Sequence, residues 1–161
     1  MSKVTLYEGI KAHLEEITDI KTVALWRNQL ERENIEIPFL YPAVFIEFLT
    51  SDYMESSSKA FQTLNMTVRL HICFESYETE DLTILDLTQQ VYSKLQLKQY
   101  GYWGVMKRRN EEQNFDHDNV QDFIQDYDCG QCKDFGADAR PSVNATIDTI
   151  IITPDIETPL T

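Results

Sequence analysis

The chain has 161 residues, 42% of them hydrophobic, and includes 8 Phe, 8 Tyr and 2 Trp, so it can bury a core and is too apolar to be disordered. Its net charge of −13 argues against a protein that grips nucleic-acid phosphates, and no apolar run is long enough for a membrane span. With 5 Gly, 5 Pro and 3 Cys, it indicates neither an interdomain linker nor a disulfide framework. We expect one domain over residues 1–161, soluble and made in a cytoplasm, because the N-terminus lacks a signal-peptide pattern.

The first predicted element is an amphipathic helix over residues 4–17. A short strand at 22–26 (TVALW) and a helical turn or loop at 28–34 follow it. The apolar stripe of the helix has the three- and four-residue spacing of a buried helix face. Its members are Leu6, Ile10, Leu14 and Ile17.

Pro38 and Pro42 predict an extended lead-in, because each lacks a backbone donor and biases the preceding residue toward extended geometry. Ala43–Thr50 (AVFIEFLT) is apolar on both faces, which predicts an internal strand or one covered by a partner chain. The serine-rich stretch 51–60, which carries Tyr53 and Met54, is predicted to be the loop at the tip of a hairpin.

The clearest pattern is the alternation of residues 64–75 (LNMTVRLHICFE), which places one side-chain set on each face of a strand. We expect this strand, running from Phe61 to Glu75, to be central, with helices on its apolar face. His71 falls on its polar face, and we interpret it as structural. The apolar set is Leu64, Met66, Val68, Leu70, Ile72 and Phe74.

A second helix is predicted over residues 80–97, with Thr79 as its N-cap. Its stripe consists of Ile84, Leu87, Val91 and Leu95. The remaining predicted elements are a strand at 100–106, a polar loop at 110–119, a weaker strand at 120–129, a loop at 130–142, a strand at 144–153 and an extended tail from 154. This order predicts an α+β fold, a mainly antiparallel sheet with two helices packed on one face.

Cys129 and Cys132 form a CxxC pair, which raises the question of a metal. Structural zinc needs four ligands, and the other candidates, Cys73 and His117, lie far away in the sequence. A thioredoxin-like site would need the pair at the start of a helix, which residues 133–136 do not provide. We therefore expect a reduced pair in a loop, with a metal site as the alternative.

Asp116–Asn119 resembles part of a calcium loop, but Gln121 and Tyr127 stand where that loop needs a glycine and a bidentate glutamate. A turn whose side chains bond the local backbone is the expected structure. No Gly-rich phosphate loop, GxSxG or HExxH motif occurs. The sequence therefore predicts no catalytic residues, no metal and no cofactor.

The charge is unevenly distributed. Residues 111–138 contain nine acids and the single base Lys133, next to the only basic cluster, Lys107, Arg108 and Arg109. Two interpretations remain open for the acidic region: a solvated face, or a loop that meets the basic cluster of a neighbouring subunit.

Three segments resemble the small tail-terminator and neck (head–tail joining) proteins of tailed bacteriophages and prophages, particularly those of gut Bacteroidetes phages. They are 36–48 (EIPFLYPAVFIEF), the long strand after a serine-rich loop, and 115–120 (FDHDNV) followed by a strand. The likeness covers about residues 20–155 in the order of elements. The region around residues 129–139 lies outside the pattern.

The resemblance implies a structural virion protein of the tail and neck, assembled in the host bacterial cytoplasm. It implies a ring of copies, commonly a hexamer, that terminates the tail tube, contacts tail-tube and neck proteins, and lets DNA pass. Alternatives are a metal-binding or small-molecule enzyme, and a non-viral binding module with the same fold. The expected oligomer interface comprises Phe39, Tyr41, Phe45, Tyr53, Met54, Lys107, Arg108 and Arg109, and the acids expected to face the DNA channel are Glu111, Glu112, Asp116 and Asp118.

Overall fold

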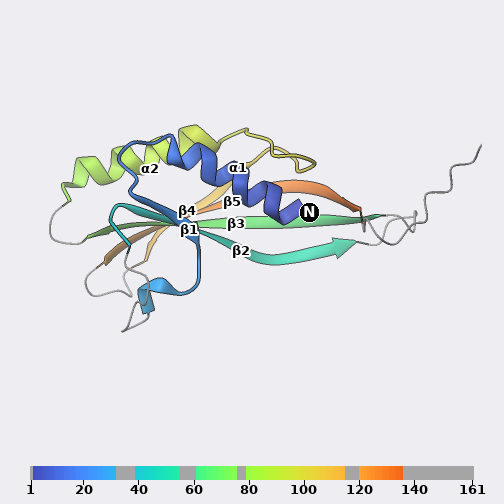
Figure 1. Cartoon of the computed structure of the whole chain (residues 1–161), viewed down its shortest axis with the longest axis horizontal. Helices are drawn as coiled ribbons and strands as arrows, with labels where there is room; N and C mark the ends of the chain where they lie inside the picture. The colour runs from blue at the N-terminus through green and yellow to red at the C-terminus, as the bar shows by residue number, and fades with distance from the viewer. Residues whose placement is uncertain (1, 32–38, 55–60, 76–78, 115–119, 136–161) are drawn as a thin grey trace, which may run out of the picture.

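The structure, a computed structural model, describes residues 2–31, 39–54, 61–75, 79–114 and 120–135. It has the predicted α+β fold, a mostly antiparallel sheet with two helices (Figure 1). The elements in chain order are α1 (Ser2–Glu15), β1 (Thr22–Leu25), the 3-10 helix η1 (Gln29–Glu31), β2 (Ala43–Met54), β3 (Phe61–Glu75), α2 (Asp81–Leu95), β4 (Lys107–Asn114) and β5 (Val120–Phe135).

Within the described residues the sheet has five strands in the order β1-β2-β3-β5-β4. Only the β1–β2 pair is parallel, and it involves just the first four residues of β2. The central position predicted for the strand over 61–75 is confirmed, because β3 pairs with β2 on one side and with β5 on the other. We call the end of the sheet at Ala43 and Glu75 the base and the end at Met54 and Phe61 the tip.

Both helices lie on one face of the sheet, which we call the helix face (Figure 1). The apolar set of β3 packs there, and its members from Leu64 to Phe74 are at most 2% exposed. The predicted stripes of both helices are also buried, so periodicity identified this core correctly. Trp103, Met106 and Tyr127 complete it.

The opposite face, which we call the second face, is covered near the base by the chain that follows β1. Trp26, Leu30, Phe39 and Tyr41 pack there against a small cluster of Ala43, Phe45 and Cys73. The apolar character of β2 on both faces is therefore satisfied at the base by the chain itself.

The strand predicted at 100–106 is wrong. Only an isolated bridge, Gln99 with Val105, occurs there, and the stretch is a turn that carries the chain from α2 to β4. Tyr100 and Trp103 are buried in the core, so their aromatic character reflects packing beneath the helices rather than a pleated strand.

Strands replace parts of three predicted loops. Residues 51–54 belong to β2, 110–114 to β4 and 130–135 to β5. In each case a backbone partner makes the strand, since the side chains do not alternate cleanly between polar and apolar. The rest of those loops (55–60, 115–119 and 136–142), the predicted strand at 144–153 and the tail lie outside the described residues.

The predicted N-cap of the second helix is also wrong. Glu80 occupies the N-cap position and makes no side-chain capping bond. The Thr79 hydroxyl instead donates to the carbonyl of Glu75 (3.4 Å), which ties the helix entry to the end of β3.

A β-bulge explains why the alternation of β5 is only partial. Cys129 and Gly130 of β5 stand opposite the single residue Met66 of β3, and Gly130 has a positive φ of 62°. The extra residue shifts the side-chain alternation by one. Cys129 and Cys132 therefore both point into the core on the helix face.

Candidate functional site

The most unusual group of side chains in the described chain is a polar cluster buried on the second face. We call it the His71 cluster, made of Glu47, His71, Cys73 and Asp122. His71 is 6% exposed and Asp122 is fully buried. Buried charge of this kind needs close partners, because removing a carboxylate from water is costly.

The cluster comes from three neighbouring strands. The Nδ1 atom of His71 lies 3.0 Å from a carboxylate oxygen of Asp122 on β5, and its Nε2 atom lies 3.2 Å from an oxygen of Glu47 on β2. Both acids are diagonal neighbours of His71, since its direct partners across the sheet are Ile124 and Phe45. The strand register alone brings the three groups together.

The cluster is closed from outside by Trp26. The indole stacks on the His71 ring with centroids 4.0 Å apart and planes 10° from parallel. The Cys73 thiol donates to the other oxygen of Asp122 (3.8 Å). Burial, reinforced by that carboxylate, raises the pKa of Cys73 well above its usual value, so the thiol stays protonated and is not an activated nucleophile.

These contacts support the structural role predicted for His71, whose partners the sequence did not reveal. The imidazole bridges two strands that flank β3, and a stacked indole covers it. The only sequence signal was its place among polar residues on a long strand, together with Asp122 and Asp126 spaced by four on β5. The pairing of His71 with Glu47 and Asp122 depends on the registers of β2 and β5 against β3, which the sequence around His71 does not reveal.

A second ion-pair group continues the second face toward the tip. Arg69 donates two hydrogen bonds to Asp126, at 2.8 and 3.0 Å, and lies 3.8 Å from Glu112. The bonds to Asp126 raise the pKa of the guanidinium. The polar face of β3 is therefore an ordered network rather than a solvated surface.

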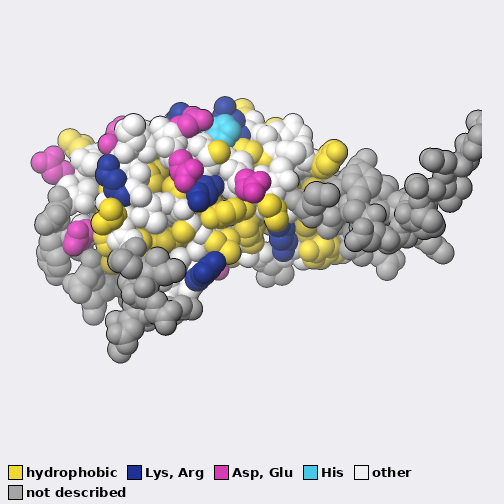
Figure 2. All heavy atoms as spheres, viewed as in Figure 1, with side chains coloured by type: hydrophobic (Ala, Val, Ile, Leu, Met, Phe, Trp, Pro, Cys, Tyr) yellow, Lys and Arg dark blue, Asp and Glu magenta, His cyan; other side chains and the backbone are white. Residues whose placement is uncertain are grey.

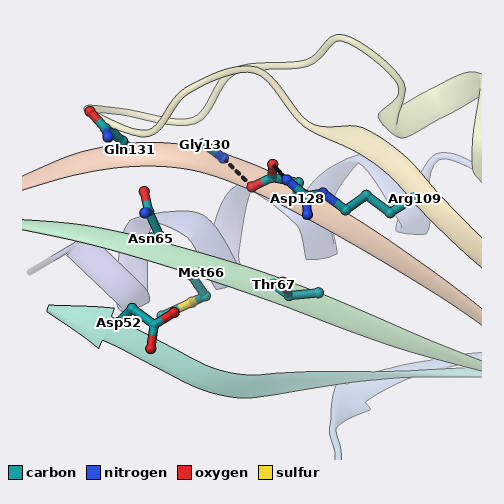
Figure 3. A pocket seen from close by; sticks show the side chains of 8 residues that line it. All are labelled: Asp52, Asn65, Met66, Thr67, Arg109, Asp128, Gly130 and Gln131. Atoms are coloured by element: carbon teal, nitrogen blue, oxygen red, sulfur yellow. Dashed lines mark hydrogen bonds and ion pairs between the residues drawn. The ribbon is translucent and has the colours of Figure 1, made fainter.

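A shallow hollow of about 330 Å³ lies nearer the tip (Figure 3). Arg109 and Asp128 form an ion pair on its wall, and the backbone N–H of Gly130 donates to Asp128 (2.9 Å). Because the arginine is already paired, the hollow does not present a free cation for an anionic ligand. Its lining is Asp52, Asn65, Met66, Thr67, Arg109, Asp128, Gly130 and Gln131.

The predicted interface residues separate into two groups. Phe39, Tyr41 and Phe45 pack together, with ring centroids 5.0 Å apart between Phe39 and each of the other two. Phe45 is 1% exposed, so it contributes no surface in the free chain. Tyr53 and Met54, near the tip of β2, are exposed by 52% and 42%.

The basic cluster begins β4. Lys107 is exposed. Arg108 lies over the ring of Tyr92 (4.0 Å to the centroid) and pairs with Glu111, and Arg109 pairs with Asp128. Two of the three charges are therefore already engaged within the chain.

The predicted channel acids that the structure describes point in opposite directions. Glu111 contacts Gln125 on the helix face (3.1 Å), whereas its neighbour Glu112 approaches Arg69 on the second face. Both carboxylates are exposed. Asp116 and Asp118 lie outside the described residues.

The CxxC pair lies inside a strand and not in the predicted loop. Both thiols are buried, and burial raises the pKa of Cys129 to about 12. No group of three His, Cys, Asp or Glu side chains suited to a metal occurs among the residues described. The metal alternative at 116–118 lies outside them.

Neither α1 nor α2 is long and apolar enough to cross a membrane. In comparisons with known proteins, no family model and no curated protein matches the chain.

Proposed function

We propose that this chain is a structural virion protein that forms a ring at the head-proximal end of a phage tail. The ring, a hexamer, terminates the tail tube, joins it to the neck and lets DNA pass through its centre. Its partners are further copies of itself, the tail-tube protein and the neck proteins. It is assembled in the bacterial cytoplasm and is not an enzyme.

The observation that carries this proposal is the unequal character of the two sheet edges. The β4 edge (KRRNEEQN) has five charged residues out of eight, whereas the outer edge of β2 beyond its short contact with β1 carries Phe48, Leu49, Tyr53 and Met54. A ring joins different surfaces of successive copies, so a molecule with two unlike edges suits it.

Charge supports the same function. The chain carries −13 overall, and carboxylates on a channel wall repel phosphate, so a duplex slides past without being held. The second face is polar toward the tip, with Asp52, Thr67 and Asp128 around its hollow. We assign this face to the channel, because the helix face carries exposed Leu82 and Leu85, which a DNA channel does not need.

The direct test is the assembly state of the purified chain. We expect multi-angle light scattering to give a mass several times 18.8 kDa, alone or with tail-tube protein, and negative-stain images to show rings with a central opening. A Tyr53→Ser, Met54→Ser variant is expected to lose assembly while keeping the melting temperature of the free domain. A strict monomer at high concentration, with and without tube protein, would refute the proposal.

A further inference from the structure

Among the residues that the structure describes, the outer edge of β2 is paired with another strand only near its start. β1 pairs only with Ala43–Ile46, and no other described residue pairs with β2 on that side from Glu47 to Met54. Along these eight residues the backbone N–H and C=O groups of alternate residues point away from β3, toward whatever adjoins this edge. Such an edge is a template for another strand.

The two edges of the sheet are protected very differently. On β4, charged side chains discourage pairing with a further strand. On β2, the free stretch ends in exposed Tyr53 and Met54. Figure 2 shows hydrophobic side chains reaching the tip end of this side, where the described chain gives way to grey residues.

A matching segment lies elsewhere in the same sequence. Residues 144–153 (NATIDTIIIT) contain seven β-branched residues in ten and one charge, Asp148. This composition favours a β-strand. An unpaired strand of this kind is prone to aggregation, so we expect it to pair with the edge of a sheet. Its ten residues are long enough to cover the eight of the β2 edge.

The place where the chain leaves the sheet is also favourable. Phe135 ends β5 opposite Phe61, so the chain departs at the tip, the end at which β2 also finishes. A position outside β2 lies three strand spacings from β5, about 15 Å, and residues 136–143 can span up to about 28 Å. A segment returning from the tip would run antiparallel to β2.

We propose that residues 144–153 of one copy add as an antiparallel strand to the Glu47–Met54 edge of the next copy. This inference rests on the proposed ring. The inference specifies the contact between successive copies in that ring. A C-terminal segment and a sheet edge are two different surfaces, as a head-to-tail contact requires. Each copy gives one strand and receives one.

Disulfide trapping between two populations of the full chain tests the inference. One population carries Asp52→Cys, and the other carries a single cysteine at Ile147, Thr149 or Ile151. Native thiols do not compete, because Cys73, Cys129 and Cys132 are buried. A bond between the two populations can form only between different molecules.

We expect a cross-linked heterodimer for at least one tail position, at least about tenfold more abundant than with a matched control. The control carries Leu82→Cys, a residue 78% exposed on α2 and remote from the β2 edge. A chain carrying Asp52→Cys and Thr149→Cys together is expected to give cross-linked multimers.

The outcomes separate this inference from the ring itself. If the double variant forms its disulfide only within one chain, residues 144–153 pair with the β2 edge of their own chain and the inference is overturned. Rings seen by light scattering with no cross-link at any tail position overturn it too, while the proposed function stands. A monomer without cross-links overturns both.

Discussion

At the scale of single residues, the charged side chains of the second face are held in hydrogen-bonded pairs and are expected to stabilise the fold more than their exposure suggests. His71 is held by acids from both neighbouring strands, and Arg69 is held by Asp126 of β5. Asp122 also accepts a hydrogen bond from the Cys73 thiol. Partly buried pairs of this kind cost stability when one partner is removed, because the other is left desolvated.

Arg69→Ala is therefore expected to lower the free energy of unfolding by about 1–3 kcal/mol, and not by the few tenths typical of a solvated surface residue. The reason is the loss of both bonds to Asp126. Urea melts of this variant, of Asp126→Asn and of the double variant measure the coupling. Lys107→Ala, at an exposed position, is the control, and an Arg69→Ala loss no larger than that of Lys107→Ala would contradict the prediction.

The Cys129 thiol should make the fold sensitive to alkali. Burial raises its pKa from about 9 to about 12, and the neutral form is the protonated one. Its stabilising contribution is therefore complete below pH 9 and is lost as the pH rises from 9 toward 12, at about 1.4 kcal/mol per pH unit. Tyr41, whose pKa burial raises to about 12, adds to the loss above pH 10.

Unfolding measured between pH 8 and 10 in the parent chain and in Cys129→Val tests this. The variant should lose stability less steeply above pH 9. If the free energy of unfolding falls with pH equally steeply in both proteins, the thiol ionises in the folded state without penalty.

At the scale of elements, backbone pairing rather than side-chain pattern determines which segments of the second half of the chain form strands. The β5 bulge brings the backbone of Gly130 close to Gly104 in the turn before β4, where an added Cβ would lie 3.1 Å from the Gly104 Cα. The bulge and that turn therefore pack closely, with no room for a side chain between the two glycines.

Gly130→Ala is expected to destabilise the protein by about 1–3 kcal/mol, because it combines a positive φ with a close backbone approach. Gln131→Ala, at the exposed next position, should stay within about 0.5 kcal/mol. Thermal melts of both compare them directly. A Gly130→Ala variant as stable as the control would mean that the bulge relaxes without cost.

The sequence predicted those elements whose side chains carry the signal. The alternation of β3 and the stripes beginning at Leu6 and Ile84 identified the core correctly, since periodicity reports which face is buried. It missed β4, which is polar throughout and is a strand only because β5 pairs with it. The His71 cluster was equally beyond reach, because Glu47 and Asp122 meet His71 through registers that no local pattern encodes.

At the scale of the whole molecule, the two faces of the sheet suit different surroundings. The helix face ends in exposed Leu82 and Leu85 on α2, whereas the second face is polar toward the tip. Under the proposed function the second face borders the DNA channel. Glu111 and Glu112, adjacent on β4 but on opposite faces, offer a matched pair to test that orientation.

Glu112→Lys is expected to create DNA binding that weakens as salt rises, whereas Glu111→Lys should create little. The added cation must lie within about 8 Å of the duplex to act at physiological salt. Fluorescence anisotropy with a short duplex at two salt concentrations measures both variants in their assembled form. Stronger binding by Glu111→Lys would reverse the orientation of the subunit in the ring.

The irregularities of the sheet also divide the molecule mechanically. Those in β2, β5 and β4 all lie within three residues of one row across the sheet, formed by Phe48, Val68, Tyr127 and Arg108. Bulges bend a strand and interrupt its ladder, so we expect the sheet to bend most easily here, between base and tip. Hydrogen–deuterium exchange should show the tip amides of β2 and β3 opening together, and earlier than those at the base. A ring built at the tip would then adapt to its neighbours without disturbing the His71 cluster near the base.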